Sequence, residues 1–193
     1  CPIAAPSANS FGKPSPTTAE HVKENMDGKI PLILDGGQCD VGIESTILDV
    51  SRDVPMLLLS GKISIEEIEA IIGTIEIHPS VTDPKQNQEI ALSPGMKYRH
   101  YSPDAEVILI TDNSKTKDII SECGNKKIGL ITNDQNHALL VMDTFLYSKD
   151  LMSDLYYFLI ELDKTVDVIL IEGVDEKEVA LMNRIKKAAS RIV

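Results

Sequence analysis

The chain has 193 residues, of which 42% are hydrophobic and 25% charged, and its formal net charge is −11 at pH 7. This composition is ordinary for a globular protein of one large or two small domains, and the acidic balance disfavours direct binding of nucleic acid by this part. The three cysteines and four histidines have neither disulfide nor metal-ligand spacing, which indicates a reducing, cytoplasmic compartment, and the longest apolar runs are too short to span a membrane.

The first block, residues 1–79, is expected to contain two helices. Ser15 followed by Pro16 is typical of an N-cap with proline at the first helical position, which predicts a helix through about Asn25. Ser64 and Glu67 form a capping box, so a second helix is expected to run from there to Gly73. Between the helices, short apolar stretches predict three strands, at Ile30–Asp35, Ser45–Val50 and Met56–Leu59.

Residues 80–103 carry several prolines and no periodic apolar pattern, which indicates a linker. The second block, residues 104–193, alternates apolar strands with helical patterns. The expected strands are Glu106–Ile110, Lys127–Thr132 and Asp167–Gly173, and the expected helices are Thr116–Glu122, Leu151–Thr165 and Val179–Ile192. Continuous apolar strands are typical of parallel sheets buried on both faces, so the alternation predicts an α/β block with a parallel sheet.

The N-terminal segment offers the first candidate binding groups. Ser7 and Asn9 alternate in Pro6-Ser-Ala-Asn9, so in an extended segment their hydroxyl and amide project from one side and suit a nucleotide phosphate or ribose. Proline, serine and asparagine are also turn formers, so a plain turn explains the same residues. Ser15 at a predicted helix start suits an anion, although simple capping of the helix explains it as well.

Two further segments mix polar and apolar residues. In Gly42-Ile-Glu-Ser-Thr-Ile47, an extended backbone places Ser45 on one face between Ile43 and Ile47, which indicates either a pocket wall or an edge strand with a tolerated serine. Residues 93–103 read SPGMKYRHYSP, which indicates a binding loop or a linker docked by its aromatic rings. No nucleophile–base pair is evident, because nothing near His100 in the sequence would orient it as a base.

The three motifs together resemble a known family. PSANSFGKPSPTTAEHV, GIESTILD and SPGMKYRHYSP, in this order and spacing, are similar to those of the Sua5/YrdC/YciO family. The linker motif and the second block resemble the long, Sua5-type members over essentially the whole chain. The resemblance implies an α/β fold with the C-terminal part of a YrdC-like twisted mixed-sheet domain at 1–79, a linker that acts as a lid at 80–103, and a small Rossmann-like parallel domain at 104–193.

The resemblance also implies an activity. Sua5-type members are threonylcarbamoyl-AMP synthases, which convert L-threonine, bicarbonate and ATP to threonylcarbamoyl-adenylate, diphosphate and water, with Mg²⁺ on the nucleotide. Their product passes to the machinery that makes the t6A modification of tRNA. By position, the ATP contacts implied are Ser7, Asn9, Ser15 and Tyr98, with His100 and Tyr101 as neighbouring candidates for the lid contact. The threonine contacts implied are the backbone of Ala5 and the side chain of Ser45.

The chain departs from the family pattern at two points. Leu59 stands where the family has an arginine that contacts ATP. Arg52 and Lys62 are candidates to supply the missing positive charge. The family's basic N-terminal motif lies before Cys1, so we expect this chain alone to be inactive. Two alternatives stay open at this stage: a carbamoyl-transfer domain of the hydrogenase-maturation type, whose relatives lack the linker motif and second block, and a non-catalytic nucleotide-binding fragment.

Overall fold

The computed structural model describes residues 1–82, 101–138, 140, 144–175 and 177–193. The first block contains α1 (Ala19–Met26), α2 (Ile65–Ile72) and α3 (Pro79–Thr82) beside a small sheet. Its strands are β1 (Ile47–Asp49), β2 (Met56–Leu59) and β3 (Glu76–Ile77). Strand β2 lies in the middle, antiparallel to β1 and parallel to β3, so the sheet is mixed, as expected. The predicted capping box of α2 is confirmed, because Ser64 and Glu67 exchange side-chain and backbone hydrogen bonds.

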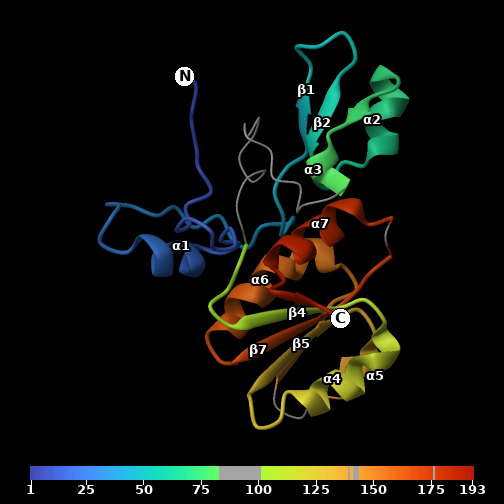
Figure 1. Ribbon diagram of the computed structural model, residues 1–193. Helices are drawn as coiled ribbons and strands as arrows, with labels where there is room; N and C mark the ends of the chain where they lie inside the picture. The colour runs from blue at the N-terminus through green and yellow to red at the C-terminus, as the bar shows by residue number, and fades with distance from the viewer. Residues whose placement is uncertain (83–100, 139, 141–143, 176) are drawn as a thin grey trace.

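The second block is a parallel α/β sandwich, which confirms the predicted fold class (Figure 1). Its sheet has the order β6-β5-β7-β4-β8, with β4 at Glu106–Ile110, β5 at Ile128–Thr132, β6 at Thr144–Tyr147, β7 at Val168–Glu172 and β8 at Arg191–Ile192. Helices α6 (Leu151–Asp163) and α7 (Val179–Ala188) lie on one face. The 3-10 turn η1 (Asn113–Lys115), α4 (Thr116–Glu122) and α5 (Gln135–Ala138) lie toward the other face.

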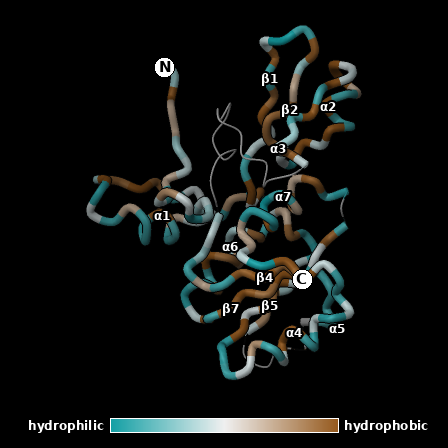
Figure 2. Tube along the Cα trace, in the orientation of Figure 1, coloured by the Kyte–Doolittle hydropathy of each residue, from teal (hydrophilic) through white to brown (hydrophobic). Residues whose placement is uncertain are grey.

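Alternating side chains of the central strands fill both faces of this sheet. Val107 and Leu109 of β4 pack with α6 and α7, whereas Ile108 and Ile110 pack with α4. The same alternation holds for β7, and Figure 2 shows the apolar residues concentrated along β4, β5 and β7. A strand buried on both faces is apolar along nearly its whole length, which makes these three strands recognisable in the sequence.

Three predicted elements of the first block differ from the structure. Residues 30–35 form no strand: Leu32 and Leu34 are 70% and 85% exposed, and a strand persists only where a neighbour pairs with its backbone. The predicted strand 45–50 is shortened to β1. Helix α1 begins at Ala19, with Thr18 as the N-cap, because the Ser15 hydroxyl bonds elsewhere.

The end of the chain and the ends of the linker also differ from expectation. The predicted helix 179–192 ends at Ala188, and β8 follows and pairs with β4. At the start of the predicted linker, Ser80 and Val81 are buried, and their carbonyls accept hydrogen bonds from Asn183 of α7. Residues 83–100, which hold most of the linker, lie outside the described residues.

The two blocks meet closely along α6. The Gly42 amide donates to the Met152 carbonyl at 3.0 Å, the Ser153 hydroxyl donates to the Asp40 carbonyl at 2.9 Å, and Ile43 joins the core formed by α6 and α7. Near the C-terminal end of α6, His21 Nε2 of α1 lies 3.0 Å from Glu161 Oε1. The first block is therefore anchored on the second through both loop and helix.

Gly42→Ala is expected to destabilise this junction by about 1–3 kcal/mol. A Cβ at residue 42 would lie 2.2 Å from the backbone oxygen of Ser153, so a segment of backbone must move. Urea denaturation of the chain measures the loss. Gly36→Ala is the matched control, because a Cβ there meets nothing within 4 Å. Equal stability of the two variants would show that the contact at Gly42 is not tight.

Candidate functional site

A cavity of about 470 Å³ lies where the N-terminal loop meets β1, the end of β2 and the end of the linker. It brings together predicted ligand contacts that are far apart in the sequence, namely Ser7, Asn9, Ser15 and Ser45. Its wall also includes Lys13, Glu44, Leu59 and Tyr101. A hydrogen bond of 2.9 Å from the Ser102 amide to the Gly12 carbonyl ties the linker end to the N-terminal loop. The cavity is therefore lined by four separate segments of the chain.

Two predicted contacts are not placed in this wall. Ala5 lies on the exposed N-terminal stretch and does not line the cavity. Tyr98, the predicted nucleotide contact of the linker, and its neighbour His100 lie outside the described residues. Tyr101, their neighbour in the same motif, is only 5% exposed and does reach the cavity.

The loop that carries Ser7 and Asn9 is a strained turn. Ala8 between them has φ 56°, a left-handed backbone that is uncommon for a residue with a side chain. The Asn9 amide nitrogen closes the turn by donating to the carbonyls of Ser10 and Lys13 at 2.9 and 3.0 Å. The Asn9 Oδ1 atom is buried and has no hydrogen-bond partner among the described residues. Asn9 thus both shapes the turn and leaves one acceptor for a ligand.

The GIESTI segment does form a wall, but not with the predicted geometry. Residues 43–46 are not a strand, so Ile43 and Ser45 do not share a face. Ile43 turns into the core of the second block, whereas Ser45 is exposed and lines the cavity beside Ile47. Thr46 holds this irregular backbone, because its hydroxyl accepts from the Gly61 amide and donates to the Ile63 carbonyl. A pocket wall is therefore the better of the two interpretations.

Among the described residues, neither Arg52 nor Lys62 takes the place of the arginine that the family has at the position of Leu59. Leu59 is buried and lines the cavity. Arg52 faces Glu76 at 3.8 Å and Lys62 lines a different cavity, so neither considered substitute lies at this wall. Lys13, which lies between the two motif serines and was not predicted as a contact, lines the cavity and forms an ion pair of 2.6 Å with Asp104.

Glu44 is a second residue of the cavity wall that was not predicted from the sequence. Its carboxylate accepts a 2.9 Å hydrogen bond from the Ser15 hydroxyl and further bonds from Tyr156 and Arg184 of the second block. The only hint in the sequence is that the carboxylate of Glu44 stands between an apolar residue, Ile43, and a hydroxyl residue, Ser45. Such a group needs partners once it is partly buried, but the sequence does not say which.

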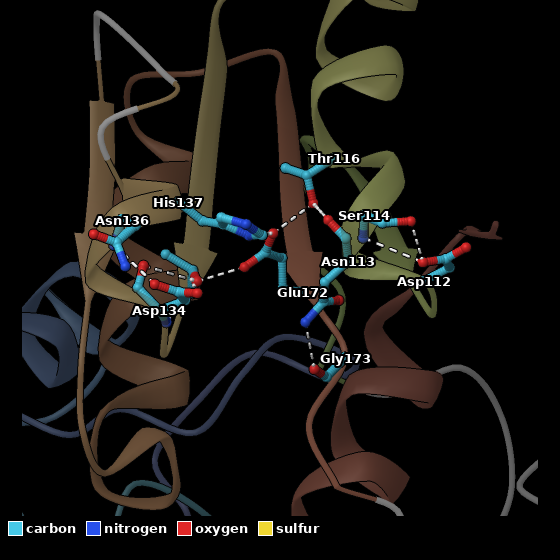
Figure 3. A network of polar contacts seen from close by, with 10 residues as sticks. Asp112, Asn113, Ser114, Thr116, Asp134, Asn136, His137, Glu172 and Gly173 are labelled. Atoms are coloured by element: carbon cyan, nitrogen blue, oxygen red, sulfur yellow. Dashed lines mark hydrogen bonds and ion pairs between the residues drawn. The ribbon is translucent and has the colours of Figure 1, made fainter.

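A second polar cluster lies in the second block, at the carboxyl ends of β5 and β7 (Figure 3). Glu172 at its centre is 1% exposed and accepts hydrogen bonds from the hydroxyls of Thr116 and Thr132. His137 Nδ1 lies 2.6 Å from the same carboxylate. Because protein donors already surround the Glu172 carboxylate, the cluster is better explained as a structural link between β5, β7, α4 and α5 than as a binding site.

The described residues provide little for a metal or a membrane. No group of three or more histidine, cysteine or acidic side chains among them is arranged to hold a metal ion. Within the same described part of the chain, the helices are all too short or too polar to cross a bilayer.

Comparison with known families matches both blocks. The family described as "Threonylcarbamoyl-AMP synthase, C-terminal domain" matches residues 63–190, and the Sua5, YciO and YrdC family described as "Telomere recombination" matches residues 1–61. Together the two matches cover nearly the whole sequence, with a junction just after β2.

Relatives and a solved structure give the same picture. The chain is 44% identical to the threonylcarbamoyl-AMP synthase of Pyrococcus abyssi over 97% of its length, and 40% and 39% identical to those of Schizosaccharomyces pombe and Bacillus subtilis. It spans only 52–58% of these relatives' lengths. The crystal structure of P. abyssi Sua5 complexed with L-threonine superposes with a TM-score of 0.86 and 41% identity, covering 97% of this chain and 58% of that one.

Proposed function

Because the chain belongs to the Sua5-type threonylcarbamoyl-AMP synthase family, we propose that it forms the threonine- and nucleotide-contacting wall of such an enzyme. The observation that carries the proposal is one cavity that brings together Ser7, Asn9, Ser15 and Ser45, four of the residues implied by the family motifs. The match of residues 63–190 to the family's C-terminal domain favours this function over a carbamoyl-transfer domain of the hydrogenase-maturation type.

The proposed reaction has two bond-forming steps. The threonine amine first takes up the carbon of bicarbonate as a carbamate, with loss of water. A carbamate oxygen then forms a bond to the α-phosphorus of ATP while the bond to the bridging oxygen breaks, and diphosphate leaves. No covalent protein intermediate is needed, so the chain's task is to hold the short-lived carbamate in line with the α-phosphate of ATP and to keep water away from it.

We divide the residues of the cavity wall into nucleotide contacts and threonine contacts. On the nucleotide side we assign Ser7 and Ser15, together with the free Oδ1 acceptor of Asn9. On the threonine side we assign the Ser45 hydroxyl and, from the family motif, the backbone of Ala5. The described residues do not fit a protein-held Mg²⁺ site, because the only acidic residue of the wall, Glu44, already binds protein donors at both oxygens. We therefore propose that Mg²⁺ enters on the ATP as part of the substrate.

The proposal includes a cellular setting. L-threonine, bicarbonate and ATP are the partners, and the adenylate passes to the enzymes that make t6A in tRNA. Three free cysteines fit a reducing, cytoplasmic compartment. The net charge of −11 disfavours direct contact between this part of the protein and tRNA.

Ser45→Ala is expected to raise the threonine KM of the gene's full-length product by about 2- to 10-fold and to leave the ATP KM nearly unchanged. The change corresponds to loss of one hydrogen bond worth about 0.5–1.5 kcal/mol. Diphosphate release at varied threonine and ATP measures both constants. Ser51→Ala is the matched control, because Ser51 is an exposed serine that does not line the cavity. Equal weakening of both substrates would refute the assignment of Ser45 to threonine.

A further inference from the structure

We propose that Glu44 is a positioning residue: it fixes the Ser15 hydroxyl in the cavity wall and is itself held by α6 and α7 of the second block. The proposal rests on the assignment of Ser15 to the nucleotide under the proposed function. It gives the second block a role in the site, although none of the residues that line the cavity comes from that block.

The contacts of Glu44 form a three-way junction. One carboxylate oxygen accepts from the Ser15 hydroxyl at 2.9 Å. The other accepts from the Tyr156 hydroxyl of α6 at 2.6 Å and from Arg184 Nε of α7 at 3.0 Å. One oxygen therefore faces the substrate wall and the other faces the second block. A carboxylate fixed at one oxygen by two donors, one of them charged, presents its second oxygen in a defined direction.

Arg184 fixes the orientation of the Glu44 carboxylate. The Arg184 side chain has no exposed surface, and Glu44 is its ion-pair partner within the described part of the chain. Its Nη2 atom is buried without a hydrogen-bond partner among the described residues. A buried guanidinium with so few acceptors loses a great deal if its carboxylate moves away, so Arg184 holds Glu44 in place.

Tyr101 closes the junction from the linker side. Its ring stacks on Tyr156 with a centroid distance of 5.2 Å, and the Arg184 guanidinium lies 5.8 Å from the Tyr101 centroid. Burial and the nearby Glu44 carboxylate raise the pKa of Tyr101 to about 12, so its hydroxyl keeps its proton at neutral pH. Tyr101 also lines the cavity, so the same packed group of side chains reaches both the second block and the substrate wall.

A buried ion pair is by itself weak evidence for anything beyond folding, so the test must separate position from stability. Within the described part of the chain, Ser15 and Tyr156 are linked through Glu44, since each donates a hydrogen bond to one of its carboxylate oxygens. If Glu44 positions Ser15, removal of the Tyr156 hydroxyl should affect nucleotide binding only while Ser15 is present. If Glu44 has only a structural role, the losses of ATP affinity caused by removing the Ser15 hydroxyl and the Tyr156 hydroxyl should be additive.

The experiment is a double-mutant cycle of Ser15→Ala and Tyr156→Phe in the gene's full-length product, read by calorimetric titration with ATP. Tyr156→Phe alone is expected to weaken ATP affinity by about 2- to 10-fold, the value of one hydrogen bond, and to add nothing in the Ser15→Ala background. Tyr157→Phe is the matched control on the same helix, because Tyr157 packs beside His21 and does not line the cavity. Additive effects, or no effect of Tyr156→Phe, would overturn the proposal.

Hydrogen exchange provides a second readout that needs no ligand. Amides of residues 13–18 should exchange faster in Tyr156→Phe and in Glu44→Gln, whereas those of β7 should be unchanged. If the unsubstituted protein binds no ATP, the proposed function fails, but exchange at residues 13–18 still decides whether Glu44 positions Ser15. Unchanged exchange there in both variants would overturn the positioning role and leave the proposed function standing.

Discussion

Glu44→Ala is expected to lower the free energy of unfolding of the chain by about 3 kcal/mol. The variant leaves Arg184, which has no exposed side-chain surface, without its carboxylate, and it removes the acceptor of Tyr156 and Ser15. An uncompensated buried charge is costly because water cannot replace the lost partner. Urea denaturation followed by circular dichroism measures the loss.

Glu76→Ala is the control for this prediction. Its ion pair with Arg52 is 3.8 Å long and about half exposed on both sides, so its loss should cost less than about 1 kcal/mol. A similar small cost for Glu44→Ala would show that Arg184 finds water or another acceptor, and that the junction between the blocks is looser than the structure shows.

Glu172→Ala is expected to lower the free energy of unfolding by about 3–5 kcal/mol, because it removes three hydrogen bonds to a buried carboxylate, each worth about 1.5–3 kcal/mol before the site relaxes. Thr116, Thr132 and His137 all lose the Glu172 carboxylate in this variant, and the two threonines, which are buried, keep only a backbone carbonyl as acceptor among the described residues. The loss should appear as a lower urea midpoint for the second block. Thr132→Val, which removes a single hydroxyl and keeps the side-chain volume, should cost about 1–3 kcal/mol.

A surface carboxylate of the same block provides the comparison. Glu122 pairs with Arg191 at 3.4 Å, and both side chains are more than half exposed, so Glu122→Ala should change stability by less than about 1 kcal/mol. If Glu172→Ala proved as mild as Glu122→Ala, the polar cluster at the ends of β5 and β7 would not be a structural link, and a binding role for it would have to be reconsidered.

The fold of the second block could be predicted because its signals are local. Strands β4, β5 and β7 each contain a run of buried, mostly aliphatic residues, and in an alternating α/β chain such runs are typical of strands buried on both faces. Strands β6 and β8 were missed because they are short edge strands with exposed residues, which leave no comparable pattern. The prediction of a strand at residues 30–35 was wrong for the opposite reason. This stretch is apolar, but a strand also requires a neighbouring strand to pair with.

The candidate site was predictable only as a set of motifs. Ser7, Asn9, Ser15 and Ser45 stand in short, recognisable segments, and the structure gathers them in one cavity. Glu44 was not predictable as a junction, because its partners Tyr156 and Arg184 follow it by 112 and 140 residues. The start of α1 was predicted wrongly for the same reason, which is a long-range contact. The Ser15 hydroxyl bonds to Glu44, 29 residues away, instead of capping α1.

The measurement that tests the central claim most directly is identification of the product made by the gene's full-length protein. The protein is incubated with ATP, L-threonine and ¹³C-bicarbonate, and nucleotides are analysed by mass spectrometry. We expect an adenylate that contains both threonine and the labelled carbon, formed together with diphosphate, and strongly reduced by Ser15→Ala. Formation of AMP or ADP alone, with no threonine-containing adenylate under these conditions, would contradict the account.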